Sequence, residues 1–184
     1  MASQLWLGSW LRFIVRSRLA PYVPTPPEVA TDMLTLARLK PGERLVDLGS
    51  GDGRLLRAAV REFGAAHAEG FELDERLVEI ARKESATLRD ELSRRVVTHM
   101  RDAHDAGEAL RHADVVTLYL SDRGNASILP LLRESLKPSA RVVSFAWTMP
   151  DGIKPSRSLR LTKSLLQLHL YEGLGRQAPV ESAS

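Results

Sequence analysis

The chain has 184 residues, of which 43% are hydrophobic and 27% charged, and these proportions are typical of a folded globular domain. It contains no cysteine, which excludes disulfides, thiolate zinc sites, iron–sulfur clusters and cysteine nucleophiles. The formal net charge is +3, and Arg12, Arg16 and Arg18 all precede the first acidic residue, Glu28. These three arginines account for the whole excess, so the remaining chain is neutral and has no overall basic charge to attract nucleic acid.

The N-terminal segment is apolar and basic. Residues 5–20, LWLGSWLRFIVRSRLA, contain no acid, and apolar side chains recur at helical spacing from Leu7 to Ile14. The uncharged run ends before Arg12, well short of the about 20 residues that a membrane-spanning helix needs. Two interpretations stay open. Residues 1–20 are an amphipathic targeting or membrane-surface segment, with peripheral membrane contact through residues 5–20, or they form a helix that packs on the domain.

The rest of the chain alternates between short apolar strands and amphipathic helices. A proline-rich strap at 21–27 cannot be helical, and Pro26 and Pro27 can start the helix that follows it. Helices are expected at 26–39, 54–63, 75 to about 92, 106–111 and 125–136, the last with Pro130 in its first turns. Strands are expected at 44–48, within 66–73, at 95–99, 114–120 and 140–147, with at least one more in 158–172. The inward face of the helix at 75 to about 92 should hold Leu77, Ile80, Ala81 and Leu88.

Nearly continuous apolar strands that are separated by helices indicate a mostly parallel sheet covered on both faces. We therefore expect a doubly wound α/β domain over residues 21–175, followed by a loose tail over 176–184. In such a sheet, ligands bind at the carboxyl ends of the strands, near the point where the strand order reverses.

The loop after the first strand has the strongest functional pattern. Residues 47–53 read DLGSGDG, and three glycines within five residues let the backbone turn sharply and approach a ligand just before a helix begins. Glu72 stands 19 residues beyond Gly53, at the end of the second strand, where a carboxylate can accept both hydroxyls of a ribose. The ordered combination of strand, glycine loop, helix, strand and acid predicts a nucleoside-binding site.

The acids of this loop favour a cationic nucleoside over a dinucleotide. The dinucleotide fingerprint G-x-G-x-x-G would require glycine at position 54, where Arg54 stands. Asp47 and Asp52 would also repel a pyrophosphate at the helix N-terminus. S-adenosylmethionine carries an ammonium and a sulfonium, so it is the better match in charge. Asp102, after the third strand, is then placed to accept a hydrogen bond from an adenine amino group.

The glycine loop, Glu72 and Asp102 resemble the motifs of class I S-adenosylmethionine-dependent methyltransferases. A longer pattern, with YVPTP at 22–26, VDLGSGDGRL at 46–55 and GFEL at 70–73, is similar to the mitochondrial protein-lysine methyltransferases that act on the ATP synthase c subunit and on the adenine nucleotide translocase. LPLL at 129–132 and ARVVS at 140–144 extend the resemblance, which covers roughly residues 20–150. It implies a doubly wound, mostly parallel, seven-stranded Rossmann-like sheet with helices on both faces, and S-adenosyl-L-methionine as the cofactor.

The resemblance also implies roles for the matching residues. The glycine loop would take the methionine end of the cofactor, Glu72 the ribose and Asp102 the adenine, while the strap at 24–26 would close over the cofactor or the substrate. The implied cofactor-binding residues are Pro24, Thr25, Asp47, Gly49, Ser50, Gly51, Asp52, Gly53, Glu72, Leu73, Asp102 and Ala103.

The methyl acceptor is expected at the carboxyl end of the fourth strand. The residues that we assign to catalysis are Tyr119, Ser121, Asp122 and Trp147, with Asn125 beside them. A lysine has a reference pKa of about 10.4, and burial beside a sulfonium would lower it, so no strong base is required. Tyr119 and Trp147 can form an aromatic wall for a cationic amine or can simply pack on the sheet, and Asp122 can instead cap the following helix.

We expect an enzyme that methylates a lysine side chain of a mitochondrial protein, at the inner membrane, with a cytoplasmic location as the alternative. The five histidines show no metal-ligand spacing, so we expect no metal. Residues 120–123, LSDR, lack the polar-Pro-Pro-aromatic motif of nucleobase N-methyltransferases, and no nucleic-acid partner is expected. Two alternatives remain: a methyltransferase for a small molecule or RNA, and a catalytically silent methyltransferase-fold subunit of a larger assembly.

Overall fold

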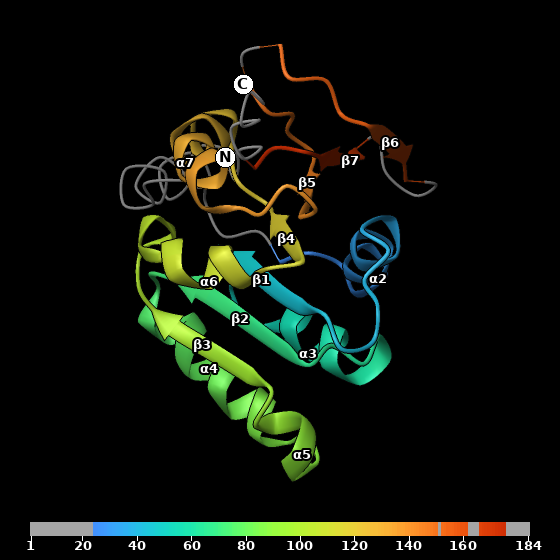
Figure 1. The fold of residues 1–184 in the computed structure, drawn as a ribbon. Coiled ribbons are helices and arrows are strands. Elements are labelled where there is room, and N and C mark those ends of the chain that lie inside the picture. Colours follow the sequence, from blue (N-terminus) through green and yellow to red (C-terminus); the bar gives the residue numbers. More distant parts are fainter. Residues whose placement is uncertain (1–23, 151, 162–165, 176–184) are drawn as a thin grey trace, which may run out of the picture.

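The computed structural model describes residues 24–150, 152–161 and 166–175 (Figure 1). The predicted N-terminal segment (1–20) and C-terminal tail (176–184) lie outside these described residues. The described strands are β1 (Arg44–Leu48), β2 (His67–Glu72), β3 (Val96–Met100), β4 (Val115–Leu118), β5 (Arg141–Phe145), β6 (Arg157–Arg160) and β7 (Gln167–Glu172). They form one seven-stranded sheet in the order β3-β2-β1-β4-β5-β7-β6.

The strand directions confirm the predicted doubly wound sheet. β1 pairs in parallel with β2 and with β4, which places Leu45 opposite Ala68 on one side and opposite Val115 on the other. β3 and β5 extend the parallel part outward, and β7 alone runs antiparallel to its neighbours β5 and β6. The order along the chain reverses between β1 and β4, so the carboxyl end of β1 is the place where this fold binds ligands.

Two hydrophobic cores lie on the two faces of the sheet, because successive strand side chains point to opposite faces. Leu45 belongs to the core that α2 and α3 cover, and Val46 belongs to the core that α6 and α7 cover. The described helices are α2 (Pro27–Leu36), α3 (Arg54–Glu62), α4 (Glu75–Ala86), α5 (Asp90–Ser93), η1 (Ala103–Asp105), α6 (Gly107–His112) and α7 (Asp122–Ser135) (Figure 1). No helix of the described ranges is both long and apolar enough to cross a bilayer.

The helix predicted at 75 to about 92 is wrong, because two helices, α4 and α5, occupy this stretch. Thr87 ends α4: its amide and its hydroxyl both donate to the Glu84 carbonyl, at 3.2 and 2.7 Å, in place of the α-helical bond. The predicted inward face is also partly wrong. Ile80 is 46% exposed, and Val78 is buried instead.

The predicted end of α2 and start of α7 are wrong as well. Arg38 has φ +53°, and Leu39 N donates to Leu34 O (3.1 Å), so a Schellman motif ends α2 at Leu36 instead of Leu39. α7 begins at Asp122 because the Ser121 side chain accepts from Gly124 N (3.1 Å) and caps it. The interpretation of Asp122 as the capping residue is therefore wrong.

The other expected elements occur with boundaries shifted by a few residues. β4 and β5 are shorter than the predicted 114–120 and 140–147, and the helix expected at 106–111 is α6 with η1 before it. The segment 158–172 holds part of β6 and all of β7. Pro130 lies in the interior of α7.

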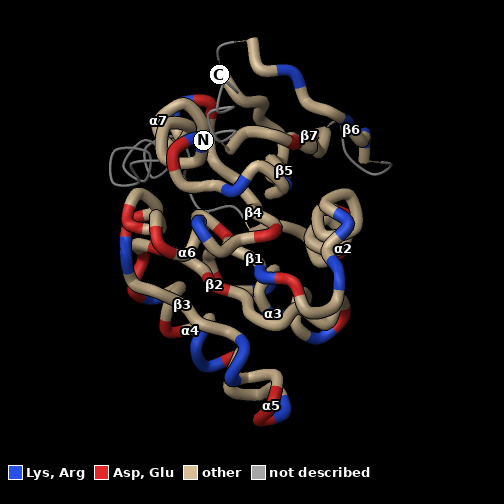
Figure 2. The backbone as a smooth tube through the Cα atoms, viewed as in Figure 1, with Lys and Arg blue, Asp and Glu red and all other residues tan. Residues whose placement is uncertain are grey.

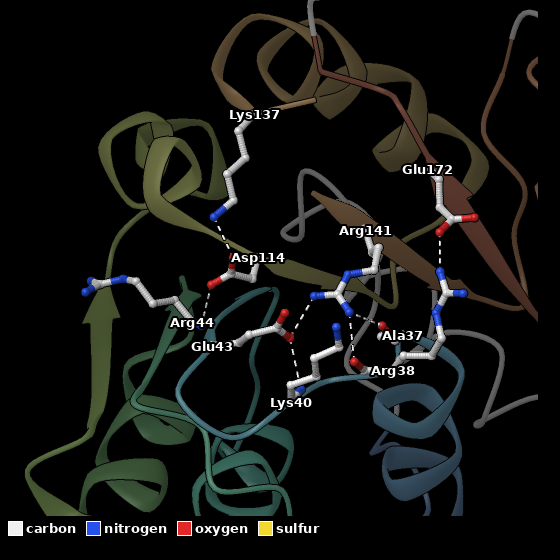
Figure 3. A network of polar contacts seen from close by, with 9 residues as sticks. All are labelled: Ala37, Arg38, Lys40, Glu43, Arg44, Asp114, Lys137, Arg141 and Glu172. Carbon is white, nitrogen blue, oxygen red and sulfur yellow. Dashed lines mark hydrogen bonds and ion pairs between the residues drawn. The ribbon is translucent and has the colours of Figure 1, made fainter. Parts of the chain in front are cut away.

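The amino-end edge of the sheet is held by a polar network around a buried arginine (Figure 3). Arg141 of β5 is only 9% exposed, and its Nη1 donates to the carbonyls of Ala37 (2.9 Å) and Arg38 (2.8 Å), just beyond the end of α2. Its Nη2 lies 2.7 Å from a carboxylate oxygen of Glu43. The network fixes α2, and with it the segment that leads into β1, from the edge opposite the glycine loop.

Candidate functional site

The loop between β1 and α3 turns through three glycines with positive φ: Gly49 (+83°), Gly51 (+53°) and Gly53 (+73°). Side chains rarely adopt such angles, so the conformation favours glycine at each position. Gly49 N donates to the Phe71 carbonyl (2.9 Å), which ties the loop to β2. A Cβ atom on Gly53 would lie 3.0 Å from the Cβ of Ala81, so this glycine also lets the start of α3 approach α4 closely.

Ser50, within this loop, has a buried side chain. It is 5% exposed, and no described residue makes a hydrogen bond with its hydroxyl oxygen. A Cβ atom on Gly70 of β2 would come within 2.5 Å of both Cβ and Oγ of Ser50. Because Gly70 has no side chain, Ser50 and the rest of the glycine loop can pack closely against β2.

Asp47 brings a buried carboxyl to the base of the loop. The residue is 4% exposed, and its Oδ1 accepts a hydrogen bond from Oγ1 of Thr117, its register partner on β4 (2.7 Å). Burial raises the pKa of Asp47 to about 7; the nearby carboxylates of Glu72 and Asp52 add to the rise, and the Thr117 hydrogen bond opposes it. A cationic group bound beside Asp47 would favour its ionised form.

Glu72, at the end of β2, joins two loops. Its Oε2 accepts from Gly51 N (3.0 Å), and its Oε1 accepts from the amides of Leu73 (2.7 Å) and Asp74 (2.9 Å). The carboxylate therefore lies between the glycine loop and the turn that begins α4. Leu73 beside it is 50% exposed.

Asp102, after β3, is the N-cap of η1. Its Oδ1 accepts from the amide of His104 (3.0 Å) and lies 2.7 Å from Nδ1 of the same residue. Nε2 of His104 lies 2.9 Å from Oγ of Ser127, on α7, and Ala103 beside this turn is buried. The sequence pattern did not indicate His104 or Ser127 as part of this site, because 23 residues separate them and no local signal links them.

The proline strap is tied to the glycine loop through Arg54. Nε and Nη2 of Arg54 bind the Asp52 carboxylate, at 2.9 and 2.5 Å, and Nη1 donates to the carbonyl of Thr25 (2.6 Å). Burial alone would raise the pKa of Asp52, but its bonds with Arg54 outweigh that effect and hold the pKa below its usual value. Thr25 is buried and Pro24 beside it is exposed. In the sequence, Arg54 served only to exclude a dinucleotide, and no pattern indicated its connection to the strap.

The residues expected around the methyl acceptor follow β4 and β5, which are neighbours in the sheet. The Tyr119 ring packs on Phe145 with centroids 4.4 Å apart, and burial raises the pKa of its hydroxyl. Ser121 caps α7, and Asp122 is the exposed first residue of that helix. Trp147, after β5, keeps 43% of its surface exposed.

The carboxyl edge of the parallel strands thus collects the predicted residues. β1, β2 and β3 contribute the carboxyl groups of Asp47, Glu72 and Asp102, and β4 and β5 lead to Tyr119 and Trp147. Carboxylates can accept hydrogen bonds from ammonium, hydroxyl and amino groups, so this set suits a cationic nucleoside. Within the described ranges, no group of three or more His, Asp or Glu side chains is arranged to hold a metal ion.

Comparisons with known proteins agree with this geometry. The sequence model of the ANTKMT methyltransferase domain family matches residues 47–157. A protein-lysine N-methyltransferase of Saccharolobus islandicus is 36% identical over 141 residues, which are 73% of this chain and 84% of that protein. The adenine nucleotide translocase lysine N-methyltransferase of Mus musculus is 36% identical over 134 residues, which are 71% of this chain and 54% of the mouse protein.

Among solved structures, an RNA methyltransferase from Salinibacter ruber in complex with S-adenosyl-L-homocysteine superposes with a TM-score of 0.76 at 33% identity. The match covers 88% of this chain and 100% of that chain. The family match begins at Asp47 and continues through the glycine loop, Glu72, Asp102 and the residues that follow β4 and β5, so it includes the carboxyl ends of β1 to β5. The chain therefore belongs to the ANTKMT methyltransferase domain family and is a class I methyltransferase.

Proposed function

We propose that this chain transfers methyl groups from S-adenosyl-L-methionine to the ε-amino group of a lysine side chain in a protein substrate. The observation that carries the proposal is the 36% identity to the Saccharolobus protein-lysine N-methyltransferase over 84% of that protein. The glycine loop and the three carboxyl groups at the carboxyl edge supply the chemistry that such an enzyme needs.

The residues present fit S-adenosyl-L-methionine, which the solved relative from Salinibacter binds in its demethylated form. Asp47, buried and titrating near neutral pH, would face the ammonium of the methionine end. Glu72 would accept from the ribose hydroxyls and Asp102 from the adenine amino group, with Leu73 and Ala103 supplying apolar contacts. The loop from Gly49 to Gly53, which includes Ser50 and Asp52, would lie along the methionine part of the cofactor. Pro24 and Thr25 of the strap would cover the site. When bound, the cofactor supplies a methyl group that its sulfonium charge already activates.

The residues that follow β4 and β5 would hold a neutral amine in line with that methyl group and exclude water. The exposed carboxylate of Asp122 would attract the cationic lysine, and the faces of Tyr119 and Trp147 would hold it by cation–π attraction. Burial beside the positive charge of the sulfonium would favour loss of the amine proton to solvent, because a like charge and the loss of water both disfavour the ammonium. The Ser121 hydroxyl, which accepts from Gly124 N, stands at the start of α7, two residues beyond Tyr119.

We also propose that residues 1–20 bring the enzyme to the mitochondrial inner membrane. The support is the acid-free apolar and basic composition of residues 5–20, and the relation to a mouse enzyme named for the adenine nucleotide translocase. Deletion of residues 1–20 should change the cellular location of a fluorescently tagged chain and leave its affinity for S-adenosyl-L-homocysteine unchanged. An unaltered location would contradict this part of the proposal.

A second candidate substrate is RNA, since the Salinibacter structure that matches over its whole length is named an RNA methyltransferase. One labelling experiment separates the two substrates. The full chain is incubated with tritium-methyl S-adenosylmethionine and a mitochondrial membrane extract from cells that lack the protein, and protein, RNA and small molecules are then separated. We expect the label in protein, and methyl-lysine after acid hydrolysis. Label confined to RNA or to small molecules would overturn the lysine assignment.

Two variants calibrate this experiment. Glu72→Ala removes the acceptor of Gly51, Leu73 and Asp74 amides and should abolish labelling. Glu75→Ala changes an exposed glutamate in the first turn of α4 and should leave the labelling as in the unmodified chain.

A further inference from the structure

The backbone directly after β5 makes a strained turn. Trp147 N donates to the Phe145 carbonyl (2.9 Å) across Ala146, whose φ is +69°. A hydrogen bond between residues i and i+2 across a positive φ is typical of the rarer, strained form of γ-turn. Alanine is disfavoured in this region, so the surrounding structure has to hold the turn in place.

Two buried polar side chains hold it. Oγ of Ser144 donates to the Trp147 carbonyl (2.7 Å), and Nδ2 of Asn125, on α7, lies 3.1 Å from the same carbonyl and 3.2 Å from that of Thr148. Nδ2 also lies 3.1 Å from Oγ of Ser144. Both side chains are 0% exposed, and hydrogen bonds are stronger in such a medium than in water. Asn125 and Ser144 are together called the turn clamp below.

The orientation of the Asn125 amide indicates that its N–H donors, and not its oxygen, stabilise the turn. Its Oδ1 is buried, and no described residue donates to that oxygen. Turning the amide over would place Oδ1 against the carbonyl oxygens of Trp147 and Thr148, which also need donors. The amide group therefore keeps its N–H groups on the turn carbonyls and on Ser144, at the expense of an unsatisfied oxygen.

The turn clamp joins the elements that border the expected acceptor site. Asn125 belongs to α7, which begins just after β4, and Ser144 belongs to β5, the neighbour of β4. The backbone of Trp147 is thus held from α7 and from β5, while the residue as a whole stays 43% exposed. A fixed aromatic side chain loses little freedom when a ligand binds against it, and its ring face attracts cations.

We propose that Asn125 is a positioning residue that acts with Ser144 to fix the strained turn, so that the Trp147 indole forms a rigid wall of the site for the acceptor lysine. That the acceptor is a lysine rests on the proposed function, whereas the clamping of the turn by Asn125 and Ser144 is independent of that function.

The first test follows the indole itself. Trp6, Trp10 and Trp147 are the three tryptophans of the chain, so Trp6→Phe with Trp10→Phe leaves Trp147 as the single fluorophore. In this full-length background, Asn125→Asp, which puts an oxygen against the two carbonyls, and Ser144→Ala should both lower the fluorescence anisotropy of Trp147 and increase its quenching by acrylamide.

Ser135→Ala is the matched control, since Ser135 is a buried serine at the far end of α7. It should leave anisotropy and quenching unchanged. If Asn125→Asp fails to fold, Ser144→Ala decides the test alone. Unchanged anisotropy in the clamp variants that fold would overturn the proposal.

The second test separates positioning from general structural damage. With poly-L-lysine as the acceptor, Asn125→Asp should raise the KM for poly-L-lysine about tenfold and change the Kd of S-adenosyl-L-homocysteine less than twofold. A parallel loss of cofactor affinity would overturn the positioning role. A wild-type chain that leaves poly-L-lysine unmethylated would count against the proposed acceptor, and the anisotropy of Trp147 would still decide the clamp.

Discussion

At the scale of single residues, the ionised form of Asp47 would favour cofactor binding but lowers the stability of the fold. Its pKa in the folded chain is about 7, against about 3.8 for an unperturbed aspartate, chiefly because of burial. Below pH about 4 the carboxyl is protonated in both the folded and the unfolded chain. Between pH about 4 and 7 only the folded chain keeps the proton, so the free energy of unfolding falls as the pH rises, by on the order of 4 kcal/mol in all.

Asp47→Asn should remove this penalty. Asparagine stays neutral and can still accept the Thr117 hydrogen bond, so urea denaturation at pH 8 should show a variant that is more stable than the wild type by a few kcal/mol. At pH 4 the two proteins should differ little. Asp90→Asn, at an exposed position on α5, is the control. Equal stabilities of wild type and Asp47→Asn at pH 8 would contradict the raised pKa.

Cofactor affinity should show the opposite pH dependence. The proposed contact between Asp47 and the ammonium of S-adenosyl-L-homocysteine requires an ionised carboxylate, so calorimetry should find affinity rising up to about tenfold per pH unit below pH about 7 and levelling above it, with proton release on binding. Asp47→Asn should bind at least about tenfold more weakly at pH 8 and lose the pH dependence. A wild-type affinity that is flat from pH 6 to 8 would show that Asp47 does not face the ammonium.

At the scale of elements, β2 and the glycine loop depend on each other through Gly70. A Cβ atom on Gly70 would meet Ser50 at 2.5 Å and Cδ1 of Leu56 at 2.7 Å, so Gly70→Ala should lower the free energy of unfolding by about 1–3 kcal/mol. Because Ser50 must move, the affinity for S-adenosyl-L-homocysteine should fall as well. Gly107→Ala is the control: its Cβ would meet nothing closer than 3.6 Å, and alanine favours the helix. Equal stabilities of the two variants would refute the packing argument.

The strap and the glycine loop are coupled through Arg54. Arg54→Met keeps much of the side-chain length but loses the bonds to Thr25 and Asp52, so the strap should loosen and calorimetry should show a loss of cofactor affinity of about tenfold. Arg61→Met, at an exposed position on α3, removes a surface pair with Glu62 and should change the affinity little. If the two variants bind S-adenosyl-L-homocysteine equally well, the strap does not contribute to the cofactor site.

The elements that were predicted correctly are those with local signals. The apolar run of β1 followed by three glycines indicated both the strand and the loop, and Pro27 indicated the start of α2. No glycine or proline near Thr87 indicates that the helix ends there. The exposure of Ile80 depends on how α4 is rotated against β3. The contacts of Arg54 with Thr25, 29 residues away, and of Asn125 with Ser144, 19 residues away, arise only when the sheet is assembled, so no sequence pattern could have shown them.

At the scale of the whole molecule, the two edges of the sheet have different tasks. The carboxyl edge carries the proposed site, and the amino edge carries the network of Figure 3. There Arg141 binds α2, while Asp114 accepts from the amide of Arg44 (2.9 Å) and lies 2.5 Å from Nζ of Lys137. These bonds connect the starts of β1, β4 and β5, so we assign this edge to stability.

Arg141→Met should therefore destabilise the fold without changing the cofactor affinity of the proposed site. It leaves Glu43 and two carbonyls without their buried partner, and we expect a loss of about 3–5 kcal/mol in urea denaturation. Arg38→Met breaks a pair with Glu172 whose side chains are 61% and 45% exposed, and the loss should stay below about 1 kcal/mol. The fraction of Arg141→Met that remains folded should bind S-adenosyl-L-homocysteine like the wild type. A weakened affinity would show that the two edges are coupled.

Outside residues 1–20 the chain carries equal numbers of basic and acidic residues, because three of its 26 Lys and Arg and none of its 23 Asp and Glu lie in that segment. This balance favours a protein substrate over RNA. In Figure 2, basic and acidic residues alternate along α4, whose sequence is ERLVEIARKESA. RNA binding usually relies on a continuous basic surface, and its affinity falls steeply with salt. Methylation by this chain should therefore depend only weakly on ionic strength between 50 and 200 mM salt, roughly the range over which phosphate-dominated binding weakens strongly.

The most direct test of methyl transfer to lysine is tandem mass spectrometry of proteins treated with the full chain and S-adenosylmethionine that carries a trideuterated methyl group. We expect the heavy methyl group on the ε-nitrogen of lysine in tryptic peptides. It should be absent when Glu72→Ala replaces the wild-type chain and present with Glu75→Ala. Heavy methyl groups found only on other side chains, or on RNA from the same sample, would contradict the assignment of this enzyme to lysine.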